Sequence, residues 1–75
     1  MNVISEARNK IKDVCKIRNE EIDYREYLSV CSRLLKIDTE LNYLCSINLP
    51  VSEIEEAAAP LIEESEQLIS KITWV

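Results

Sequence analysis

Paired carboxylates are the residues of this chain whose types and spacing come nearest to a catalytic or metal-binding pattern. They stand at Glu20–Glu21, Glu55–Glu56 and Glu63–Glu64. All-helical metal-dependent pyrophosphohydrolases use a Glu-Glu-x-x-Glu arrangement, and no pair here has an acid three residues beyond it. The chain has no histidine, the commonest general base and metal ligand, and no glycine for a phosphate-binding loop. We therefore expect no enzyme, no metal and no cofactor, and we interpret these glutamates as a solvated helix face.

The three cysteines are the other candidates for reactive groups. An odd number without close pairs does not form a disulfide framework. Cys31 and Cys45 would lie about 21 Å apart along one helix, whereas Cys15 could approach Cys31 across a helix pair. All three stand at apolar positions, so we predict that they are packed core thiols.

The elements that position these residues are predicted to be three helices, over about residues 3–18, 24–47 and 52–73. Apolar residues recur at helical spacing in each segment, and the absence of glycine disfavours tight turns and hairpins. The middle segment has an apolar arc of roughly 200°, about twice what one neighbouring helix covers. We therefore expect an all-α antiparallel three-helix bundle, or a long helical hairpin with a shorter N-terminal helix. Because 75 residues form only a modest core, we also expect a dimer.

The first turn is predicted from capping signals. Asp23 suits an N-cap with Glu26 three residues later, and Ile22 with Tyr27 suits a hydrophobic staple. The alternative is one continuous helix over residues 3–47, because the apolar phases of its two halves nearly match.

The second turn is predicted at Pro50, which biases the residue before it away from helical angles. Ser52 and Glu55 then suit the capping box of the third helix. Pro60 stands inside that helix, where it predicts a kink or a short break after Ala59.

Charge is distributed unevenly along the chain, whose net charge is −5. Residues 1–18 carry five basic residues against two acidic ones, and residues 48–75 carry six glutamates against one lysine. Arg8, Lys12 and Lys16 form a ridge at i, i+4 and i+8 that could meet nucleic-acid phosphates, or the acidic helix could mimic nucleic acid or bind a basic protein. The simpler interpretation is that the first and third helices neutralise each other. Nucleic-acid binding is therefore not the leading expectation.

Asp38 is the most unusual single residue, because it lies near the centre of the apolar arc of the middle helix. A carboxylate there is costly unless it is paired or hydrated. If the first two helices fold back on each other, Arg8 comes near Asp38. We predict an Arg8–Asp38 pair, or a water-filled gap, that fixes the register of the two helices.

These features lead to the expectation of a small acidic helical protein that acts by stoichiometric protein–protein interaction. It would be an adaptor, inhibitor or assembly subunit of a cell, phage or mobile element, with another protein and a second copy of itself as partners. The N-terminus has no signal-peptide pattern and no segment is long enough to span a membrane, so we expect a cytoplasmic location, the host cytoplasm for a viral protein. The expected interface residues are Tyr27, Val30, Ile37, Tyr43, Glu56, Glu63, Glu66 and Trp74.

Overall fold

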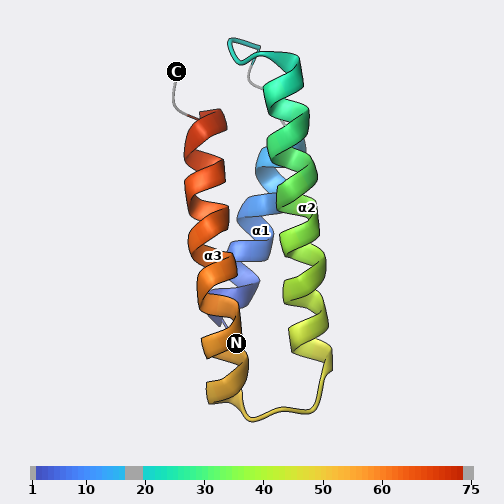
Figure 1. Ribbon diagram of the computed structural model, residues 1–75, viewed down its shortest axis with the longest axis vertical. Coiled ribbons are helices and arrows are strands. Elements are labelled where there is room, and N and C mark those ends of the chain that lie inside the picture. Colours follow the sequence, from blue (N-terminus) through green and yellow to red (C-terminus); the bar gives the residue numbers. More distant parts are fainter. Residues whose placement is uncertain (1, 17–19, 74–75) are drawn as a thin grey trace.

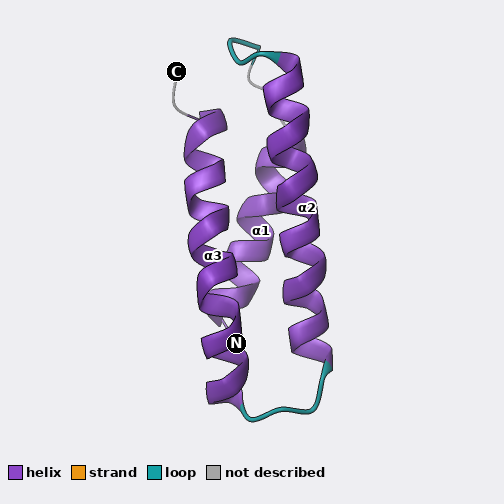
Figure 2. Cartoon of the chain, viewed as in Figure 1, coloured by secondary structure: helices purple, strands orange, loops and turns teal. Residues whose placement is uncertain are grey.

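The computed structural model describes residues 2–16 and 20–73, and within these ranges the chain folds into three helices without a strand. The helices are α1 (Asn2–Lys16), α2 (Tyr24–Ser46) and α3 (Val51–Thr73). They run up, down and up, and each packs on the other two to form a rod of 42 × 16 × 15 Å (Figures 1 and 2). The predicted all-α antiparallel three-helix bundle is confirmed.

The turn between α1 and α2 is fixed by the first residues of α2. The Asp23 carboxylate accepts a hydrogen bond from the Glu26 backbone N–H at 3.3 Å, as expected of an N-cap. Ile22 and Tyr27 are both buried, and residues 20–22 form a turn, so the alternative of one continuous helix is wrong. The Tyr27 hydroxyl also donates to the carbonyl oxygens of Val14 and Cys15, at 3.2 and 3.1 Å. These carbonyls belong to the last described turn of α1, and the final carbonyls of a helix generally need partners outside its own ladder of hydrogen bonds. Tyr27 thus joins the end of α1 to the start of α2.

The turn between α2 and α3 differs in detail from the prediction. The Pro50 carbonyl accepts from the backbone N–H groups of Glu53 and Ile54, each at 3.1 Å, so the helix already begins at Val51. Ser52 therefore lies inside the first turn and is not the N-cap. Further along, α3 continues without interruption through Pro60, so the short break after Ala59 does not occur. Pro60 is exposed, which keeps its ring out of the packed side of the helix.

The core lies along α2, which packs against both other helices. Its fully buried side chains are Leu34, Ile37 and Leu41, and α1 contributes Ile4 and Ile11. The wide apolar face that suggested a dimer is therefore covered mainly within the chain. Two leucines at its outer edge, Leu28 and Leu35, stay exposed. Dimerisation remains a prediction.

Candidate protein-binding groove

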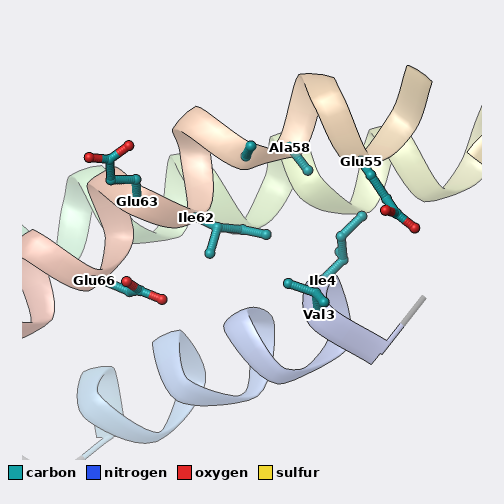
Figure 3. Close-up of a pocket in the computed structure, with 8 residues that line it drawn as sticks. Val3, Ile4, Glu55, Ala58, Ile62, Glu63 and Glu66 are labelled. Carbon is teal, nitrogen blue, oxygen red and sulfur yellow. The ribbon is translucent and has the colours of Figure 1, made fainter. Parts of the chain in front are cut away.

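An open groove of about 290 Å³ runs between α1 and α3. Its floor is apolar, and glutamates stand along the α3 side (Figure 3). The lining residues are Val3, Ile4, Glu55, Ala58, Ala59, Ile62, Glu63 and Glu66. The side of the bundle opposite α2 is thus hollowed rather than filled.

A second, smaller hollow of about 60 Å³ extends this groove toward the other end of the bundle. It shares Val3, Ile62 and Glu66 with the first hollow and reaches Ile69 on α3. From Glu55 to Ile69 the lined part of α3 is about 21 Å long, or about four helical turns. We refer to the two hollows together as the α1–α3 groove.

Small residues account for the groove. Ala58 and Ser65 are buried where α3 meets α1, and Ala59 stands exposed beside them. The Ser65 hydroxyl donates to the Ile62 carbonyl oxygen at 2.7 Å, so this buried polar group is satisfied within its own helix. Because none of the three side chains is large, the rims of α1 and α3 are not bridged across the surface. Val3 consequently keeps 61% of its surface exposed.

The electrostatic character of the groove is acidic. Glu55, Glu63 and Glu66 line it from α3 and Glu6 from α1, whereas Lys10 is the lining residue of opposite charge. Clefts lined by charges of one sign raise the local concentration of oppositely charged groups. The α1–α3 groove therefore combines apolar contact area with attraction for cations.

A different groove, of about 410 Å³, lies between α2 and α3. Tyr43, which is 63% exposed, and Pro60 line it together with Leu44, Ala57 and Leu61. Its lining includes a single acid, Glu40. This α2–α3 groove lacks the acidic rim of the first and serves below as its internal control.

The residues predicted to form an interface are divided by the structure. Glu63 and Glu66 line the α1–α3 groove, Tyr43 lines the α2–α3 groove, and Glu56 is exposed outside both. Trp74 lies outside the described residues.

The other three predicted interface residues need a correction, because Tyr27, Val30 and Ile37 are only 8%, 6% and 0% exposed and belong to the core. The wide arc of α2 is covered from both sides, so its central residues face α1 and α3 rather than an external partner. Val3, Ala59 and Ile62 line the α1–α3 groove but were not predicted as interface residues. The small residues of α3 were the sequence feature that could have indicated a groove at this position.

Arg8, the first residue of the predicted basic ridge, is engaged in contacts within the bundle. Arg8 Nε donates to Asp38 Oδ1 at 2.9 Å and Arg8 Nη1 donates to Asn42 Oδ1 at 3.1 Å. The predicted Arg8–Asp38 pair is thus present, with side chains 25% and 16% exposed. Lys12 and Lys16 are exposed. The role of Asp38 in fixing register remains a prediction.

A second ion pair joins α2 to α3. Arg33 reaches both carboxylate oxygens of Glu64, with Nη2 at 2.9 Å from Oε1, and this pairing raises the pKa of Arg33 and lowers that of Glu64. Arg8 of α1 and Glu64 of α3 therefore each pair with α2, whereas the sequence suggested that α1 and α3 neutralise each other. Both Arg33 and Glu64 are exposed enough that the pair adds little to stability.

The thiols do not share one environment. Cys31 is buried and Cys15 half-buried, as predicted, but Cys45 is exposed, which corrects the expectation of a third core thiol. Burial, followed by a hydrogen bond with Cys31, raises the pKa of the Cys15 thiol to about 12. A thiol that stays protonated is a poor nucleophile, so Cys15 is suited to packing.

Two further observations concern the described part of the chain. No three His, Cys, Asp or Glu residues gather there in a group that could hold a metal ion. None of α1, α2 and α3, as described, is long and apolar enough to cross a membrane. No protein-family model, curated protein or solved structure matches this chain.

Proposed function

We propose that this protein acts without catalysis, as an adaptor, inhibitor or assembly subunit that binds another protein stoichiometrically through the α1–α3 groove. The observation that carries the proposal is the combination of an apolar floor with an acidic rim on an open face of the bundle. Val3 and Ala59 are exposed on the floor, and covering these apolar side chains with a partner would lower the free energy of the complex. The rim glutamates can meanwhile stay hydrated or pair with the partner.

The shape of the groove favours a protein partner over a small molecule. Pockets for small ligands enclose most of the ligand surface. The larger of the two hollows of the α1–α3 groove, of about 290 Å³, is open rather than enclosed. Extended, shallow grooves between helices are the geometry in which proteins receive peptide segments.

Nucleic-acid binding finds less support in the same structure. Arg8 is held by Asp38 and Asn42, which leaves Lys12 and Lys16 as exposed members of the ridge. Two lysines on a chain of net charge −5 provide few phosphate contacts. The protein-binding proposal is therefore the one that we develop.

Affinity capture from the source cell tests the proposal with a matched pair of variants. Ala59→Gln places a polar side chain in the α1–α3 groove, and Ala57→Gln makes the same change in the α2–α3 groove. Both sites are exposed, and circular dichroism verifies that both variants fold. We expect a stoichiometric partner, identified by mass spectrometry, to be captured by wild type and Ala57→Gln but not by Ala59→Gln. Equal capture by all three, or no stoichiometric partner for any, contradicts the proposal.

A further inference from the structure

The length and direction of the α1–α3 groove suggest the shape of its occupant. α1 and α3 run in the same direction (Figure 1). The groove follows α3 over about four helical turns and α1, from Val3 to Lys10, over about two. On α3 the lining residues Glu55, Ala58, Ala59, Ile62 and Glu66 follow the spacing of one helix face. A partner helix laid along this face would contact α1 and α3 together, as α2 does on the other side of the bundle.

The side chains of the floor permit such a close approach. Ala58 and Ala59 leave room for the backbone of a neighbouring helix. Val3 and Ile62 offer apolar contacts on both sides of it (Figure 3). Packed helices lie about 8–10 Å apart, and small residues at the contact favour the shorter distance. The matching helix would present a narrow apolar stripe at i, i+3 or i+4, and i+7.

The rim determines the charge of that helix. Glu6, Glu55, Glu63 and Glu66 stand beside the floor, against Lys10 alone among the lining residues. Lysines or arginines flanking the apolar stripe would meet these carboxylates, whereas acidic flanks would be repelled. A second copy of this chain docked groove to groove would bring two sets of glutamates together.

From this arrangement we infer that the occupant is an amphipathic helix of a partner protein with basic residues on both flanks of a narrow apolar stripe. The inference rests on the proposed function and specifies the chemistry of the partner.

Selection from a displayed library of 20-residue helices tests the inference. The library keeps one apolar stripe and varies the flanking positions among Lys, Glu, Ser and Gln. It is selected on wild type, on Glu63→Lys/Glu66→Lys, and on Glu40→Lys/Glu56→Lys, which changes net charge equally at exposed sites outside the α1–α3 groove. We expect Lys-flanked helices on wild type and on the control, and about tenfold weaker binding of these helices to Glu63→Lys/Glu66→Lys.

The possible results separate this inference from the proposed function. Enrichment of Glu-flanked or uncharged helices whose binding is lost in Ala59→Gln overturns the basic partner but leaves groove binding standing. Equal binding of Lys-flanked helices to both charge variants does the same. If the binding of the selected helices is unchanged by Ala59→Gln, both the inference and the proposed function are overturned. The last measurement is sedimentation of wild type, Ala59→Gln and Ala57→Gln, each without a partner helix. A wild-type dimer that is abolished by Ala59→Gln but not by Ala57→Gln would make a second copy of the chain the occupant and overturn the inference.

Discussion

The Arg8–Asp38 pair gives the most direct test of how the bundle is held in register. Three variants form the test: Asp38→Leu, Arg8→Leu and the double variant. In Asp38→Leu the guanidinium loses the carboxylate at 2.9 Å and keeps Asn42 at 3.1 Å as its hydrogen-bond partner. In the double variant both polar groups are replaced by apolar side chains.

The magnitude follows from the burial of the two side chains. Two unit charges about 4 Å apart attract by about 4 kcal/mol at an effective dielectric constant of about 20, and desolvation offsets much of this. Pairs in full contact with solvent contribute at most about 1 kcal/mol, and breaking a buried pair costs about 3–5 kcal/mol. With exposures of 25% and 16%, the Arg8–Asp38 pair lies between these limits. We expect a coupling free energy of about 1–2 kcal/mol and a double variant within about 1 kcal/mol of wild type.

Urea denaturation followed by circular dichroism measures the free energies of unfolding for this cycle. A two-dimensional NMR amide spectrum of each variant measures whether one folded arrangement is present. If the pair fixes register, the double variant keeps its helical content but shows broadened or duplicated amide signals, because apolar side chains at both positions allow α1 to slide along α2.

Two results would refute this reasoning. A coupling free energy below about 0.3 kcal/mol would mean that the pair makes no net contribution to stability. A double variant with one sharp set of amide signals would mean that side-chain packing alone specifies the register.

Three further predictions concern Tyr27 and the cysteines. Tyr27→Phe should lower the free energy of unfolding, measured in urea, by about 1 kcal/mol, because the carbonyls of Val14 and Cys15 lose their donor. Tyr43→Phe, at an exposed site, should change the free energy of unfolding by less than about 0.5 kcal/mol. Equal effects of the two substitutions would contradict this role of Tyr27. In the presence of reductant, stability should fall as pH rises from about 9.0 to about 12, because the unfolded Cys15 thiol ionises near its ordinary pKa of 9.0 while the folded one stays protonated. Denaturation curves should show a smaller loss of stability at alkaline pH in Cys15→Ala but not in Cys45→Ala. In the folded protein, a thiol reagent should modify the exposed Cys45 before Cys15 and Cys31.

The parts of the fold that the sequence predicts are those governed by local signals. Asp23 and Glu26 are three residues apart, so their capping contact depends on little beyond the turn itself. The Arg8–Asp38 pair was also predictable, because one turn near residue 21 brings these two positions together in any antiparallel hairpin. The start of α3 was misplaced since the Pro50 carbonyl can replace a side-chain cap, and side-chain patterns carry no signal for that contact.

The candidate site was harder to predict because exposure depends on all three helices at once. The apolar arc of α2 contains both Ile37 and Leu35, and periodicity assigns both to one face. In the structure Ile37 is covered, while Leu35, at the edge of the arc, is half exposed. The same limit applies to Cys45, which shares the arc but stands exposed near the end of α2.

The α1–α3 groove results from the sizes of the side chains that each helix contributes to the contacts between helices. α2 supplies a face wide enough for two neighbours, and buried apolar residues of α1 and α3 join those of α2 in one core. Where α1 and α3 line the groove, α3 carries the small residues Ala58, Ala59 and Ser65 beside Ile62 and Ile69. Filling the groove with larger residues would add contact area and stability. The unfilled strip and the four glutamates beside it are the features on which the proposed binding of a partner rests.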